Sequence, residues 1–72
     1  MSKKTEHLKI TAKAARINKG KTQKETAMYL GVSKATYANY ENGITNPQYD
    51  TVKEFAKFVE WPHDDIIFAP RI

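Results

Sequence analysis

The sequence predicts an all-α fold, a compact bundle of five short helices. Three glycines and three prolines divide the chain into pieces of helical length. Within these pieces apolar residues recur every three or four positions, which is the helical period, and strand patterns are nearly absent. The 72 residues, 40% of them hydrophobic, allow one domain with a single core.

The first helix is expected at residues 6–18, after a short basic arm at residues 1–5. Two neighbouring apolar stripes run along it: Leu8, Ala12 and Ala15 on one face, and Ile10, Ala14 and Ile17 beside it. Gly20 follows at the kind of position where helices commonly end.

The next two helices are short and close together. Thr22 and Glu25 have the spacing of a capping box, which starts a second helix that Gly31 ends. Ser33 is a good N-cap for a third helix that extends to about Glu41. The connection between the two helices is barely three residues long, so together they are typical of a helix-turn-helix motif.

Side chains of suitable size occupy the demanding positions of this motif. Ala27 is small where the two helices cross, and Gly31 is expected to adopt a positive φ in the sharp turn. Val32 and Tyr37 are expected to fill the space beneath the turn.

Two further helices complete the predicted domain, which extends over residues 6–68. Residues 49–60 form the fourth helix, whose apolar stripe is Val52, Phe55, Ala56 and Val59. Residues 62–68 form the fifth, with Asp64 and Asp65 in a first turn where carboxylates suit the helix dipole. Residues 69–72 remain as a C-terminal tail.

The charge is unevenly distributed. Residues 1–40 carry nine basic and two acidic side chains, whereas residues 41–72 carry three basic and six acidic ones. This asymmetry favours a polyanion on one face, although charge alone does not choose between nucleic acid, anionic lipid and a solvated surface.

Several functional classes are disfavoured. The chain has no cysteine and only two histidines, which argues against disulfides, thiol chemistry and a metal site. Asp64 and Asp65 are adjacent and point about 100° apart on a helix, so they do not form a catalytic pair. We therefore expect no enzyme, no cofactor and no small-molecule ligand. Without a membrane-spanning run or a signal peptide, a cytoplasmic location is expected and no membrane partner.

The ordered motifs resemble one family over residues 8–68. They are Arg16, Thr22-Gln23, Glu25-Thr26-Ala27, Leu30-Gly31-Val32-Ser33, Thr36-Tyr37, Tyr40-Glu41-Asn42-Gly43 and Asn46-Pro47. In this order and spacing they resemble the Cro and repressor type of helix-turn-helix proteins, also called the XRE family, which are small phage and bacterial regulators with a lambda repressor-like domain. The chain departs from the family at Thr26, where leucine is usual, and at Ala12 and Ala15, where bulkier residues are common.

This resemblance implies a transcriptional regulator, a repressor of phage or bacterial type, that binds double-stranded DNA. Its third helix is then expected in the major groove, and base readout is assigned to Lys34, Ala35, Ala38 and Asn39, because Tyr37 and Tyr40 belong to the core. Lysine can donate to guanine, asparagine can pair with adenine, and alanine can touch a thymine methyl group.

Other roles follow from the same resemblance. Phosphate contact or bracing is assigned to Thr22, Gln23, Ser33, Thr36, Asn42, Gly43, Lys21 and Lys24. Arg16 and Glu41 are expected to form a structural ion pair between the first and third helices.

Self-association is also expected, as a homodimer at least on a palindromic DNA site. Ile66, Ile67, Phe68 and Ile72 exceed what a small core can absorb from its last turn, and the stripe of Ile10, Ala14 and Ile17 is the alternative surface. Two other functions stay open for the same fold: an antitoxin that regulates its own synthesis, and a module that binds only proteins.

Overall fold

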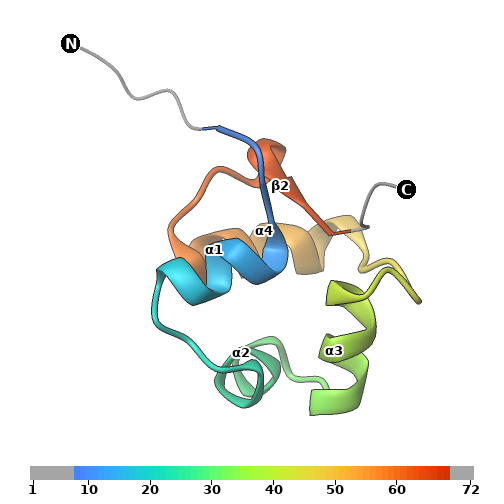
Figure 1. Ribbon diagram of the computed structural model, residues 1–72. Coiled ribbons are helices and arrows are strands. Elements are labelled where there is room, and N and C mark those ends of the chain that lie inside the picture. Colours follow the sequence, from blue (N-terminus) through green and yellow to red (C-terminus); the bar gives the residue numbers. More distant parts are fainter. Residues whose placement is uncertain (1–7, 69–72) are drawn as a thin grey trace, which may run out of the picture.

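The computed structural model describes residues 8–68. In chain order its elements are β1 (Ile10–Thr11), α1 (Ala12–Asn18), α2 (Gln23–Leu30), α3 (Lys34–Glu41), α4 (Tyr49–Val59), a 3-10 turn (His63–Asp65) and β2 (Ile66–Ile67). Helices α2 and α3 form one side of the domain, the strand pair lies on the opposite side, and α4 packs against α1 and α2 (Figure 1). Among the described residues, no helix is both long and apolar enough to cross a bilayer.

The core lies where the four helices meet. Its fully buried apolar residues are Ala12, Ala15, Ala27, Tyr37, Phe55 and Val59. The alanines let α1 and α2 approach the centre closely, and Tyr37 and Phe55, whose ring centroids are 6.0 Å apart, are the two largest fully buried side chains. The predicted inward positions Ala27, Tyr37, Phe55, Ala56 and Val59 are thus confirmed, whereas Val52 is only half-buried.

The expected first helix begins later than its apolar pattern indicates. It starts at Ala12, because the Oγ1 atom of Thr11 caps it by accepting a hydrogen bond from the backbone N–H of Ala14 at 3.1 Å. Residues 8–10, which precede this cap, are not helical, and Leu8 is 82% exposed instead of buried.

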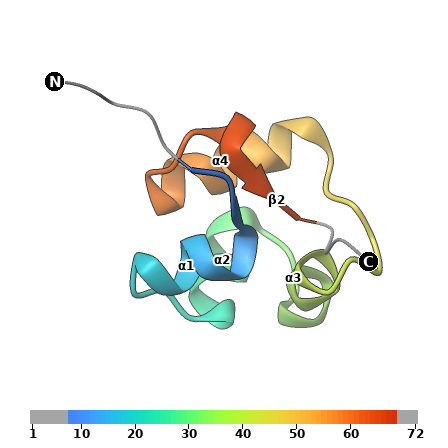
Figure 2. The same cartoon turned by 45° about the horizontal axis from the view of Figure 1, so that its top comes forward.

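The expected fifth helix is a second correction. Residues 63–65 form one 3-10 turn, after which Ile66 and Ile67 pair in parallel with Ile10 and Thr11 (Figure 2). Branched side chains at Cβ favour extended backbone, and the partner strand offers hydrogen bonds that a last helical turn lacks. The described domain therefore has four α-helices, in agreement with the all-α helix-turn-helix class, and a two-stranded pair that the sequence pattern did not reveal.

The C-terminal apolar residues are less available than expected. Ile66 and Phe68 pack against the core, and the ring centroid of Phe68 lies 5.0 Å from that of Phe55. These two residues are therefore not surplus to the core. Ile67 is half-buried, and Ile72 lies outside the described residues, as do the arm at residues 1–5 and the tail at residues 69–72.

Gly31 provides a direct test of the turn between α2 and α3. Its φ is 76°, and a Cβ atom added there meets no atom within 4 Å. Gly31→Ala is therefore expected to lower the free energy of unfolding by about 1–2 kcal/mol through backbone strain alone. Gly31→Asn should cost less, because asparagine tolerates this conformation better. Urea unfolding of both variants checks this, and equal losses would contradict the conformational explanation.

Candidate nucleic-acid interface

Local hydrogen bonds set the positions of α2 and α3. Thr22 Oγ1 accepts from the backbone N–H of Glu25 at 3.0 Å, and Glu25 Oε1 accepts from the backbone N–H of Thr22 at 2.8 Å, so the predicted capping box is present. Gly31 ends α2 with a left-handed backbone. Ser33 Oγ then caps α3 by accepting from the backbone N–H of Thr36 at 3.0 Å. These contacts confirm the helix-turn-helix predicted from the sequence.

Thr26 explains how the motif accommodates a departure from the family pattern. Its side chain is completely buried, where the family usually has leucine. The hydroxyl donates to the backbone carbonyl of Thr22 at 2.8 Å, one helical turn earlier. The hydroxyl group is therefore satisfied inside the core without a partner from another helix.

The four residues assigned to base readout lie on α3 and differ in how exposed they are. Lys34 and Ala35 are exposed in the first turn of α3, whereas Ala38 and Asn39 are half-buried. Tyr37, between them, is fully buried, and Tyr40 packs against the core. The exposed N-terminal part of α3 therefore presents Lys34 most openly, and the contacts of all four residues with DNA remain a prediction.

The residues assigned to phosphate contact surround this helix. Thr22, Lys24, Ser33, Asn42 and Gly43 are exposed, and Lys21, Gln23 and Thr36 are half-buried. Several are already engaged: the hydroxyls of Thr22 and Ser33 act as caps, and Lys21 Nζ lies 5.1 Å from the ring centroid of Phe58. Contact of these residues with phosphate stays a prediction.

A buried ion pair connects α1 and α3. Arg16 Nε donates to Glu41 Oε2 at 2.6 Å, and the two side chains are 9% and 2% exposed. Arg16 Nη1 also donates to the backbone carbonyl of Lys21 at 2.8 Å. The pairing implied by the family resemblance is thus present, and it fixes the end of α3 to α1 and to the connection before α2.

Gln23 takes a place that the sequence did not indicate. The sequence assigns Gln23 to phosphate contact or bracing, and in the structure its Nε2 donates to Glu41 Oε1 at 3.0 Å. The Glu41 carboxylate therefore receives hydrogen bonds from α1 and from the first residue of α2. Three helices meet at this one carboxylate, which a sequence pattern of separate helices cannot reveal.

The charge of Glu41 makes the stability of this junction depend on pH. Burial is the largest single influence and raises the pKa of Glu41, but its hydrogen-bonding neighbours and the positive charge of Arg16 together outweigh burial and hold the pKa below the ordinary value of 4.5. A carboxyl group with a lowered folded pKa contributes stability fully above 4.5 and loses it as the pH falls through the folded pKa.

We therefore expect the unfolding midpoint of the wild type to fall steeply as the pH is lowered below 4.5. The Glu41→Gln protein should be less stable than the wild type at neutral pH. It should lose less stability on acidification, because the titrating carboxyl group is absent. Thermal unfolding followed by circular dichroism over a pH series measures both slopes. Parallel slopes for the two proteins would show that Glu41 does not carry the effect.

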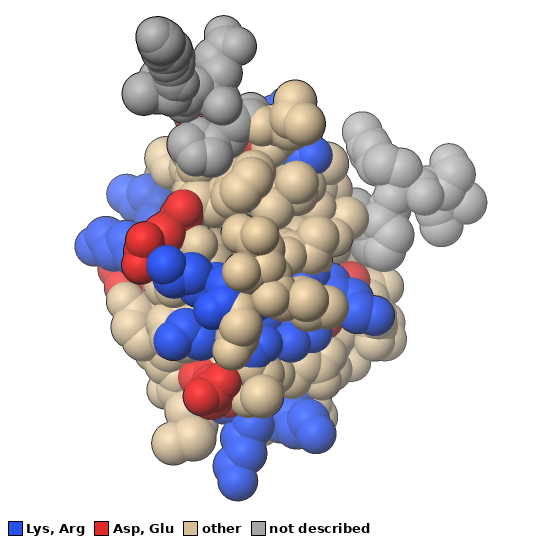
Figure 3. Space-filling view, turned by 60° about the vertical axis from the view of Figure 1, so that its left-hand side comes forward, with Lys and Arg blue, Asp and Glu red and all other residues tan. Residues whose placement is uncertain are grey.

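The basic side chains are concentrated on part of the surface. Figure 3 shows Lys and Arg side chains in a band on the face that carries the α1–α2 connection, beside isolated acidic groups. Some lysines are paired, since Lys19 Nζ lies 2.8 Å from Glu60 Oε2 and Lys57 Nζ lies 3.5 Å from Glu54 Oε2. Lys24 and Lys34 form no ion pair with any residue from 8 to 68, so their charge remains available to a polyanion.

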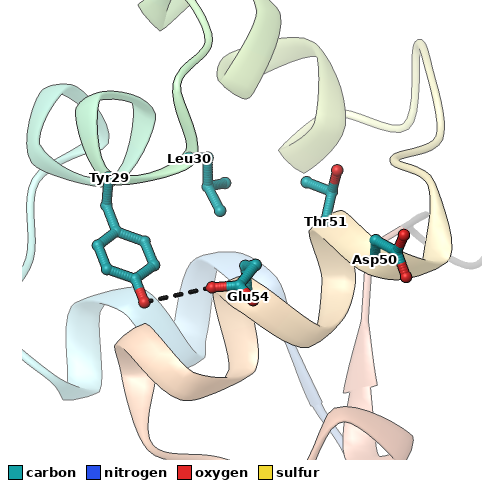
Figure 4. Close-up of a pocket in the computed structure, with 5 residues that line it drawn as sticks. All are labelled: Tyr29, Leu30, Asp50, Thr51 and Glu54. Atoms are coloured by element: carbon teal, nitrogen blue, oxygen red, sulfur yellow. Dashed lines mark hydrogen bonds between the residues drawn. The ribbon is translucent and has the colours of Figure 1, made fainter.

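A small cavity lies between α2 and α4, apart from the exposed end of α3. It has a volume of about 150 Å³ and is lined by Tyr29, Leu30, Asp50, Thr51 and Glu54, with the Tyr29 hydroxyl 3.5 Å from Glu54 Oε1 (Figure 4). Its two carboxylates repel phosphate groups, so we do not include this cavity in the nucleic-acid interface.

Comparison with known proteins agrees with this geometry. The pattern of the helix-turn-helix family matches residues 13–65. A Vibrio cholerae protein, the cryptic phage CTXphi transcriptional repressor RstR, is 36% identical to the chain over 52 residues. The match covers 72% of this chain and 47% of that repressor, so the chain spans about half the length of this curated relative. No solved structure matches the chain.

Proposed function

The chain belongs to the helix-turn-helix family, with the Cro and repressor type of motif, and from this membership we propose that it regulates transcription by binding double-stranded DNA at specific sequences. The observation that carries the proposal is the placement of α3. Its N-terminal part is exposed and follows a sharp turn, while its C-terminal end is fixed to α1 by the Arg16–Glu41 pair. A helix presented in this way fits the major groove.

The proposed mechanism is occupancy of an operator by two copies. Each copy inserts α3 into a major groove, and the two grooves lie about 34 Å apart on a near-palindromic site. Lys34 and Asn39 read bases, while Thr22, Ser33, Thr36 and the backbone near Gly43 contact phosphates. Bound in this way, the protein represses by excluding polymerase or another regulator, and no catalytic step is involved.

Selection of binding sites from random duplex DNA at two salt concentrations tests this function. We expect enrichment of a palindromic consensus, with affinity falling steeply as salt rises because phosphate contacts release counterions. No enrichment at either concentration would reject the proposal and favour a module that binds only proteins. Enrichment of a single half-site without a palindromic repeat would contradict binding as a dimer but would still support sequence-specific binding.

The surface for self-association remains a separate proposal. Of the C-terminal apolar residues, Ile67 is half-buried and, unlike Ile66 and Phe68, is not packed against the core. On the alternative stripe Ile17 is 56% exposed. Sedimentation measures how many copies of the Ile67→Glu and Ile17→Glu variants bind to the selected duplex. The variant that binds as a single copy identifies the surface for self-association.

A further inference from the structure

Tyr37 has a polar group that the proposed interface does not use. The residue is completely buried, and its hydroxyl forms no hydrogen bond with any of the described residues. Phenylalanine would fill the same volume without leaving a buried hydroxyl unpaired, which is unfavourable. The hydroxyl therefore calls for an explanation.

The position of this hydroxyl connects it to the ion pair. Tyr37 precedes Glu41 by four residues on α3, which places the two side chains on one face of the helix. Burial, and after it the neighbouring Glu41 carboxylate, raises the pKa of Tyr37. The hydroxyl therefore keeps its proton at neutral pH and remains a hydrogen-bond donor beside an acceptor that already has other donors.

The proposed function makes conflicting demands on one of those other donors. The Gln23 amide donates to Glu41 Oε1 at 3.0 Å in this structure, yet Gln23 begins α2 and is assigned to a DNA phosphate. When its amide turns to the phosphate, the buried carboxylate of Glu41 loses a donor. Water cannot easily replace that donor, because the Glu41 side chain is only 2% exposed.

We propose that Tyr37 is a positioning residue that donates its hydroxyl to Glu41 when Gln23 turns to DNA, so that the Arg16–Glu41 pair stays satisfied in the complex. The exchange rests on the proposed function. It needs rotation about the Tyr37 C–O bond and a small shift of the two side chains. Gln23 and Tyr37 thus alternate as donors to one carboxylate, one in the free protein and the other on DNA.

The test uses four proteins: the wild type, Tyr37→Phe, Gln23→Ala and the double variant. For each, the unfolding midpoint of the free protein and the Kd for the selected duplex are measured. In the wild-type background Tyr37→Phe should leave the midpoint unchanged or raised and weaken binding about tenfold, because Glu41 lacks its replacement donor only on DNA.

In the Gln23→Ala background, Tyr37→Phe should affect the unfolding midpoint and not the Kd. The hydroxyl then serves Glu41 in the free protein as well, so Tyr37→Phe lowers the midpoint and changes the Kd by less than about twofold. Tyr40→Phe is the matched control, because it removes a hydroxyl from the same helix. Its effects on midpoint and Kd should be the same in both backgrounds.

The exchange is overturned if Tyr37→Phe has the same effect on both quantities in both backgrounds. A purely structural hydroxyl would give that result. If the wild type binds no duplex, the proposed function fails, and the midpoints still decide whether Tyr37 substitutes for Gln23. If Tyr37→Phe then leaves the midpoint of the Gln23→Ala protein unchanged, Tyr37 does not replace Gln23 as the donor to Glu41.

Discussion

Replacing Arg16 with alanine is expected to lower the free energy of unfolding by about 3–5 kcal/mol and to weaken DNA binding with it. The substitution leaves the Glu41 carboxylate buried without its cation, and a buried unpaired charge is more unfavourable than the absence of both partners. It also removes the donor to the Lys21 carbonyl, which fixes the connection before α2. Urea unfolding and duplex binding below the unfolding transition measure the two effects.

Two further variants separate the ion pair from general effects. Lys13→Ala removes a positive charge from an exposed position on the same helix, and its stability should stay within about 0.5 kcal/mol of the wild type. Arg16→Met with Glu41→Leu replaces the pair by apolar groups of similar volume and should recover much of the lost stability. An Arg16→Ala protein that melts with the wild type would show that the pair does not hold α1 to α3.

Lys34→Ala and Asn39→Ala are each expected to weaken binding to the selected duplex by about 1–3 kcal/mol. Each should also relax the sequence preference at one base pair of each half-site, because the lost contact reads a base edge. Stability should change little for Lys34→Ala, since this side chain is exposed and makes no ion pair within residues 8–68. Binding curves for the consensus and for single-base variants of it measure affinity and specificity together.

Lys53→Ala is the matched control for charge. Lys53 is an exposed lysine on α4, outside the helix-turn-helix, with its Nζ 5.0 Å from the Tyr49 ring centroid. Loss of this lysine should weaken binding to all duplexes slightly and by the same factor. If Lys34→Ala behaves in the same way, Lys34 contributes only charge, and base readout must come from other residues of α3.

Local signals in the sequence were sufficient for the centre of the domain. The Thr22–Glu25 capping box, the Ser33 cap and the positive φ of Gly31 involve neighbouring residues, so their spacing predicts their geometry. The Arg16–Glu41 pair joins distant residues and was predicted through the family resemblance alone.

The remaining features depend on residues that are distant in sequence. Two segments that were expected to be helical form paired strands instead, Ile10 and Thr11 with Ile66 and Ile67. The helical periodicity of the sequence does not indicate this pairing. Gln23 is similar, because its choice between solvent and Glu41 depends on how α2 sits against α3. Sequence patterns therefore indicated which residues gather at the site, but not which hydrogen bonds they form there.

The pairing of β1 with β2 has a consequence for the order of folding. It closes the longest loop in the described chain, so its formation costs the most chain entropy and offers only two residues of strand on each side. Helices with local contacts form sooner than such long-range pairs. The strands should therefore join last, after α4 has docked, and protection of their amides from hydrogen exchange should be lost before that of α4.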